Sequence, residues 1–160
     1  MKKGIILSVC ALFISFGVSA QVFDKNALGI KIGGATGDFS GTGTQISYQR
    51  GLNDINRLEF GLSFTFHSSH STLGIDGFYQ WVRKIDGGLN WFVGPGASIG
   101  SVSIKHGGSE MLMGVGGVIG IEYRFPKTPI QLSLDITPIF GLINSQGFYS
   151  SFGLGIRYCF

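Results

Sequence analysis

Apolar and polar residues alternate along most of the chain, and this alternation constrains the fold more than any other feature of the sequence. In residues 57–67 every second side chain is apolar, and the residues between are polar or glycine. Successive side chains of a β-strand point to opposite faces, whereas a helix repeats its apolar face every three or four residues. The pattern therefore predicts a strand whose apolar face carries Leu58, Phe60, Leu62, Phe64 and Phe66.

The same alternation recurs in about eight segments of roughly ten residues, the number and length typical of the smallest outer-membrane barrels. Short turn-forming connections are expected at 51–56, 86–88 and 126–129. Longer polar connections are expected between them, at 36–43, 68–72, 101–110 and 144–147. The sequence therefore predicts an all-β fold, a closed antiparallel transmembrane β-barrel of about eight strands in up-and-down meander order, over residues 21–160.

The first twenty residues have the pattern of a signal peptide. Lys2 and Lys3 begin the segment, residues 5–18 are mostly apolar, and Val18, Ser19 and Ala20 form a small-residue cleavage site. We predict cleavage after Ala20, which indicates export through the inner membrane. Cys10 suggests a lipoprotein signal as an alternative, but the apolar stretch before it is very short and Val9 is a poor neighbour for lipid attachment.

The composition of the chain favours a membrane over water. Charged residues make up 13% of the 160 residues, against about 25% in ordinary soluble domains. The longest apolar stretch after the signal, residues 111–121, is shorter than the ~20 residues of a membrane-spanning helix. Without Lys2 and Lys3, ten basic residues face nine acidic ones, which gives no reason to expect nucleic acid as a partner. Removal of the signal peptide also removes Cys10 and leaves Cys159 as the single cysteine, so no intramolecular disulfide is expected.

Alternation alone does not say which face of the strands is outside, since soluble lipocalin-type barrels alternate with the apolar face inside. Three observations favour an apolar exterior. The polar face is rich in Gly, Ser and Thr, which suits a narrow interior. An even strand number puts both termini at the end with the tight turns. Aromatic residues gather near that end, as in the interfacial girdles of membrane barrels: Tyr48, Trp81, Trp91, Tyr123, Phe125, Tyr158 and Phe160.

This assignment directs four cations and four anions into the lumen. An eight-stranded barrel has room only for side chains, so these charges must pair. We expect a salt-bridged plug, with an ion or proton pathway as the alternative. The predicted charge network consists of Lys31, Arg57, Glu59, Asp76, Glu122, Arg124, Asp135 and Arg157.

One cluster could carry catalysis. His67, Ser68, Ser69, His70 and Ser71 fall at a predicted outer loop, and a His–Ser pair with an acid can transfer acyl groups. The extended motif of lipid A deacylases is missing and no acid lies nearby, so a solvated hairpin tip is the favoured interpretation.

Other candidate binding residues carry no ligand pattern. The glycines from Gly114 to Gly120 lack phosphate-loop spacing and are interpreted as small lumen-facing positions. His106 and Glu110 lack metal-ligand spacing. We expect no cofactor, no metal and no catalytic residue.

The final residues, Gly155-Ile156-Arg157-Tyr158-Cys159-Phe160, resemble the C-terminal signal of the OmpA/OmpX-type outer-membrane barrels, a family that includes small porin-family proteins of Gram-negative bacteria. Gly155, Tyr158 and the terminal Phe160 carry the resemblance. Gly153 stands where that family usually has a polar residue. The resemblance implies insertion by the barrel-assembly machinery and says little about activity.

The leading functional hypothesis is a non-enzymatic, monomeric barrel of the outer membrane that contributes to envelope integrity or surface contacts. Its expected partners are outer-membrane lipids, lipopolysaccharide and, during biogenesis, the assembly machinery. The alternatives are a lipid A-modifying acyl hydrolase or transferase at the outer rim and a narrow pore for small solutes.

Overall fold

The chain folds into eight antiparallel strands that close into one barrel. The computed structural model describes residues 25–36, 41–66, 70–104, 108–143 and 147–160, so the predicted signal peptide lies outside the described residues. None of these residues belongs to a helix long and apolar enough to cross a bilayer. The strands are β1 (Asn26–Ala35), β2 (Gly41–Gly51), β3 (Asn56–Phe66), β4 (His70–Asp86), β5 (Leu89–Ile104), β6 (Ser109–Arg124), β7 (Ile130–Ile143) and β8 (Phe148–Cys159).

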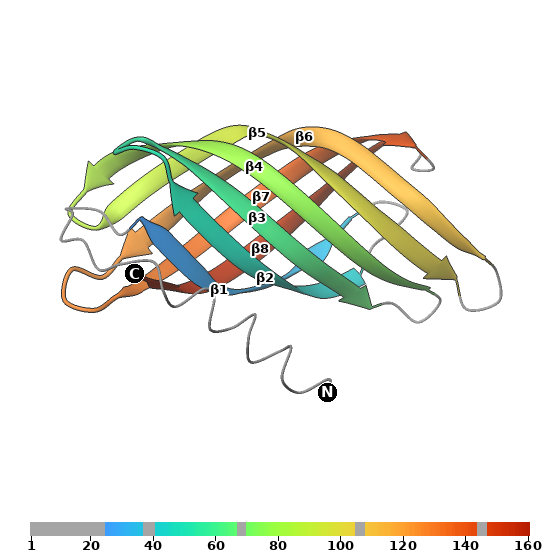
Figure 1. Cartoon of the computed structure of the whole chain (residues 1–160), viewed down its shortest axis with the longest axis horizontal. Helices are drawn as coiled ribbons and strands as arrows, with labels where there is room; N and C mark the ends of the chain where they lie inside the picture. Colours follow the sequence, from blue (N-terminus) through green and yellow to red (C-terminus); the bar gives the residue numbers. More distant parts are fainter. Residues whose placement is uncertain (1–24, 37–40, 67–69, 105–107, 144–146) are drawn as a thin grey trace, which may run out of the picture.

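Each strand pairs with its neighbours in sequence, and the first strand pairs with the last. Leu28 of β1 lies opposite Tyr48 of β2 on one side and Tyr158 of β8 on the other. Strands β1 and β8 are neighbours in the closed sheet, and Figure 1 shows the strands running obliquely to the long axis of the barrel. The predicted fold, a closed antiparallel meander of eight strands, is confirmed. Closure leaves no free sheet edge, which is how a β-structure satisfies its backbone groups in lipid.

The two ends of the barrel differ in their connections. At one end, the tight-turn end, the strands are joined by residues 52–55, 87–88 and 125–129. At the other, the loop end, the connections are 36–40, 67–69, 105–108 and 144–147. The predicted connections at 68–72 and 101–110 were too long, because β4 begins at His70, β5 runs to Ile104 and β6 begins at Ser109. Polar pairs such as Ser71 and Ser103 continue the ladder beyond the apolar stretch.

The outer wall of the barrel is apolar. Among the described residues, 33 large hydrophobic side chains are exposed, whereas seven hydrophobic residues are buried. Outward-facing residues meet across strands, as Ile46 does with Leu62 and Leu62 with Ile75. Soluble monomers rarely expose contiguous apolar surface on this scale. The distribution is that of a protein whose exterior is solvated by something other than water.

The interior holds an apolar cluster that the sequence analysis did not anticipate. Phe78, Phe92, Val118 and Ile139 are buried against one another on the lumen side of β4–β7. Inward-facing glycines make room for them. A Cβ on Gly96 would overlap the Phe78 ring, one on Gly120 would lie 2.6 Å from Phe92, and one on Gly114 would lie 2.5 Å from Ile139.

One glycine in that stretch departs from the prediction. Gly117 shares the outward phase of Val115 and Ile119, so it is not a lumen-facing position. The alternation of β6 requires this, because Gly116 and Val118 on either side of it face inward.

Candidate functional site in the barrel lumen

Glu59 is the most connected charged residue of the lumen. Its Oε1 lies 2.7 Å from Nζ of Lys31 and 2.8 Å from a terminal guanidinium nitrogen of Arg157. The same oxygen accepts a hydrogen bond from Oγ of Ser47 at 2.9 Å. Its Oε2 accepts from the side-chain amides of Gln49 and Gln80, both at 2.9 Å. An ionised carboxylate has about four acceptor positions, so Glu59 is fully satisfied as an anion although only 1% of its surface is exposed.

A second carboxylate lies closer to the tight-turn end. Glu122 binds Arg57 at 2.6 Å and accepts hydrogen bonds from Gln131 at 2.6 Å and from Asn90 at 3.3 Å. Arg57 also donates to Oε1 of Gln80 at 2.6 Å, and its guanidinium carbon lies 4.8 Å from the centre of the Phe92 ring. Gln80 therefore joins the Glu122 group to the Glu59 group, and Phe92 joins both to the apolar cluster.

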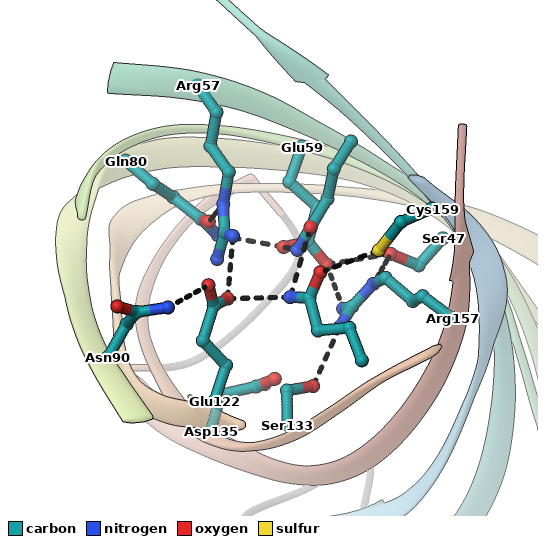
Figure 2. A network of polar contacts seen from close by, with 12 residues as sticks. Ser47, Arg57, Glu59, Gln80, Asn90, Glu122, Ser133, Asp135, Arg157 and Cys159 are labelled. Carbon is teal, nitrogen blue, oxygen red and sulfur yellow. Dashed lines mark hydrogen bonds and ion pairs between the residues drawn. The ribbon is translucent and has the colours of Figure 1, made fainter. Parts of the chain in front are cut away.

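Arg157 and Asp135 complete the network on the side of β7 and β8. Arg157 donates to Ser47 at 2.9 Å and to Ser133 at 2.7 Å, and Lys31 lies 3.0 Å from Oδ2 of Asp135. Figure 2 shows Ser47, Ser133, Asp135 and Arg157 pointing toward the interior of the barrel together with Arg57, Glu59, Gln80 and Glu122. Every strand contributes to this lumen network, which consists of Lys31, Ser47, Gln49, Arg57, Glu59, Gln80, Asn90, Glu122, Gln131, Ser133, Asp135 and Arg157.

The eight charged residues singled out from the sequence all occupy inward-facing positions, and six of them form the ion pairs described above. Asp76 accepts a hydrogen bond from Nε2 of Gln45 at 2.6 Å. Arg124 borders a small cavity of about 60 Å³ at the tight-turn end. The sequence analysis missed the glutamines, although Gln45, Gln49, Gln80 and Gln131 share the polar phase of their strands with the charges. That shared phase was the signal that could have found them.

The half of the lumen toward the loop end is open space. A cavity of about 200 Å³ lies there, and Lys31, Asp76 and Asp135 border it on the side of the lumen network. Phe78, Ile139 and Tyr149 form one wall, and the remaining strands contribute mostly glycine, serine and threonine. This outer cavity is larger than the cavity of about 60 Å³ at the tight-turn end.

Comparison with known proteins bears on the fold. No protein-family model and no curated protein matches the sequence. Among solved structures, Neisserial surface protein A superposes with a TM-score of 0.67 at 16% identity over 84% of this chain and 96% of that one. The N-terminal β-barrel domain of Pseudomonas aeruginosa OprF gives 0.62 at 18% identity over 85% and 98%. Ail, the attachment invasion locus protein of Yersinia pestis, gives 0.53 at 13% over 84% and 96%.

All three are small eight-stranded outer-membrane barrels, and each is matched over nearly its whole length. This chain has the OmpA/OmpX-type barrel fold. The likeness agrees with the resemblance of its last residues to the C-terminal signal of that group. In this OmpA/OmpX-type barrel Gly155 faces the lumen and is buried, while Tyr158 and Phe160 point outward with their ring centres 6.3 Å apart.

Within the described residues, the His and Ser cluster near residue 70 does not bring a histidine and a serine to the same face of a strand. His67, Ser68 and Ser69 lie outside the described residues. His70 and Ser71 are consecutive residues of β4, so their side chains project to opposite faces of the OmpA/OmpX-type barrel. Ser71 faces outward in register with Phe66, whereas His70 faces the lumen.

Proposed function

We propose that this protein is a non-enzymatic, monomeric outer-membrane barrel with a structural or surface-interaction role, and that its lumen is closed by the lumen network. One observation carries the proposal. Apolar side chains cover the outside of the barrel, while ion pairs and hydrogen bonds from all eight strands fill the half of the lumen next to the tight turns. We infer that these ion pairs and hydrogen bonds make that half of the interior rigid and leave no continuous polar path for a solute through it.

The proposal includes how the protein reaches and sits in the membrane. Residues 1–20 act as a cleaved signal peptide, and Gly155, Tyr158 and Phe160 are the residues that the assembly machinery recognises. Arg50 and Arg83, both exposed at strand ends near the tight turns, extend to the headgroup layer on the periplasmic side. Lipids contact the outer wall, and lipopolysaccharide contacts the loop end. Names such as surface protein and attachment protein among the structural neighbours are consistent with a role at the cell surface.

Membrane fractionation combined with gel migration tests the proposal directly. The protein is expected in the outer-membrane fraction, and its unboiled form is expected to migrate differently from its boiled form, because a closed barrel resists detergent until heated. Recovery of the mature protein in the soluble fraction without detergent would contradict the proposed location. A band that does not shift on heating would contradict the closed barrel itself.

A further inference from the structure

The outer cavity has an excess of negative charge on the side that borders the lumen network. Two carboxylates, Asp76 and Asp135, face it together with one ammonium group, that of Lys31. Lys31 does not neutralise both, because its Nζ is bound to Asp135 and to Glu59. Among the described residues, no cation forms an ion pair with Asp76, whose contact is the neutral amide of Gln45. An uncompensated carboxylate in a confined space is costly, and a cation from solution would relieve that cost.

Two carboxylates and a hydroxyl group that can accept hydrogen bonds border the outer cavity. Asp135 binds Lys31 through Oδ2, and its Oδ1 would lie 3.3 Å from a Cβ added to Gly153, which also borders the cavity. Asp76 uses Oδ2 for Gln45, and ionised carboxylates only accept. Oγ1 of Thr72, on the cavity wall, is buried and has no hydrogen-bond partner among the described residues. A ligand that suits this set of atoms must donate several hydrogen bonds.

The rest of the cavity sets the size and the body of such a ligand. Phe78 and Ile139 give an apolar wall, and Tyr149 stands beside them with its hydroxyl 3.2 Å from Oγ of Ser98. An apolar cavity of about 150 Å³ accommodates benzene, so about 200 Å³ accommodates an aromatic ring with a short side chain. The cavity reaches Ala35 and Thr65, at the strand ends that lead into the loop end, so a ligand would enter from outside the cell.

We propose that the outer cavity is a binding site for a small organic cation, a primary ammonium compound with an apolar body of about the size of 2-phenylethylammonium. The ammonium group binds the carboxylates of Asp76 and Asp135, and the apolar body packs against Phe78 and Ile139. This site is separate from the proposed role of the barrel, which the fractionation experiment tests independently of any ligand.

Titration of the refolded mature protein tests the site. The protein is held in a non-ionic detergent, so that no detergent headgroup competes, and amide NMR signals of Gly74, Gly100 and Gly153 report on the cavity lining. The probes are 2-phenylethylammonium, the neutral 2-phenylethanol and the anionic 3-phenylpropanoate. We expect saturable shifts with the ammonium compound and at least tenfold weaker binding of the other two. Equal binding of the alcohol or the carboxylate, or no saturable shift, would overturn the proposal.

Variants locate the contact. Asp76→Asn is expected to weaken binding of the ammonium compound at least tenfold, whereas Asp54→Asn, an exposed carboxylate at the tight-turn end, is expected to leave it unchanged. Unaltered binding of the ammonium compound in Asp76→Asn overturns the assignment. It is also overturned if potassium chloride alone shifts the same amide signals and the ammonium compound causes no additional shift. Heat-modifiable migration shows whether Asp76→Asn is folded. If it is not, Thr72→Val, with an expected several-fold loss, takes its place.

Discussion

Glu59 is the residue on which the stability of the interior depends most. It compensates Lys31 and Arg157 at once, and both of those side chains are buried. Removing one partner of a buried ion pair leaves an uncompensated charge, which costs about 3–5 kcal/mol. We therefore expect Glu59→Gln to lower the free energy of unfolding by about that amount in urea titrations of the protein in lipid vesicles, followed by tryptophan fluorescence.

Asp54→Asn is the matched control for that measurement, because Asp54 is an exposed acid in a turn and its replacement is expected to change stability by less than about 0.5 kcal/mol. A Glu59→Gln variant as stable as Asp54→Asn would show that the ion pairs around Glu59 contribute little.

Leu62 and Ser63 test the two faces of β3 at adjacent positions. Leu62 faces outward between Ile46 and Ile75, whereas Ser63 faces the outer cavity. An arginine in the hydrocarbon midplane of a barrel costs about 2–4 kcal/mol, so Leu62→Arg is expected to lose that much stability in the same assay. Ser63→Thr is expected to be tolerated, because its side chain projects into open space. Equal losses in the two variants would contradict the assignment of faces.

At the scale of elements, β5 and β6 are longer than a membrane requires. Sixteen residues at about 3.3 Å each and a tilt of about 40° rise about 40 Å, against an apolar band of about 25 Å in such barrels. The surplus lies toward the loop end, where the outward residues become polar, as at Ser71, Ser101 and Ser103. We therefore expect these strand ends to stand in water above the membrane.

Cysteine labelling tests whether the strand ends at the loop end extend beyond the membrane. Ser103→Cys is expected to react on intact cells with a membrane-impermeant maleimide, whereas Leu134→Cys, an outward residue of β7 in the apolar band, is expected to stay unlabelled. The unmodified protein gives the background, since its Cys159 is buried. Labelling of Leu134→Cys, or protection of Ser103→Cys, would place the membrane elsewhere on the barrel.

The inward glycines of β6 provide a test of packing between elements. A Cβ on Gly120 would lie 2.5 Å from the Leu134 carbonyl oxygen and 2.6 Å from the Phe92 ring, so backbone would have to move. We expect Gly120→Ala to destabilise the barrel by about 1–3 kcal/mol. Gly153→Ala is the comparison, because its Cβ would meet only side-chain atoms at 3.3 Å or more. Similar stability of the two variants would count against tight packing around Phe92.

The same elements show what the sequence could predict. Alternation predicted the number of strands, their order and their outward faces. A shift of one residue would turn every apolar side chain of a strand to the opposite face, so the apolar pattern fixes which face is outside. It did not give the apolar cluster, since Phe78, Phe92, Val118 and Ile139 each adjoin another apolar residue and interrupt the alternation. Nor did it give the ends of β4 and β5, where paired serines continue the ladder without any hydrophobic signal.

For the whole molecule, the lumen network predicts an electrically silent barrel. Arg57, Glu59, Gln80 and Arg157 are joined by ion pairs and hydrogen bonds across the half of the interior next to the tight turns, and Phe92 and Ile139 are buried in the apolar cluster beside them. Purified protein in planar bilayers is expected to show no sustained conductance. Steady, reproducible channel currents from the unmodified protein would contradict a closed lumen and would favour the pore hypothesis instead.

Lys31 belongs to the first strand, Arg157 to the last, and both bind Glu59 on the third. In a partly inserted sheet β1 and β8 are not yet paired, so the three groups cannot meet. The side chain of Arg157 would then lack Glu59 as its counterion in the membrane. Arg157 therefore gains Glu59 as its counterion when β8 pairs with β1, so closure of the barrel adds an electrostatic contribution to insertion. Ion pairing in the lumen therefore favours completion of the barrel after insertion has started.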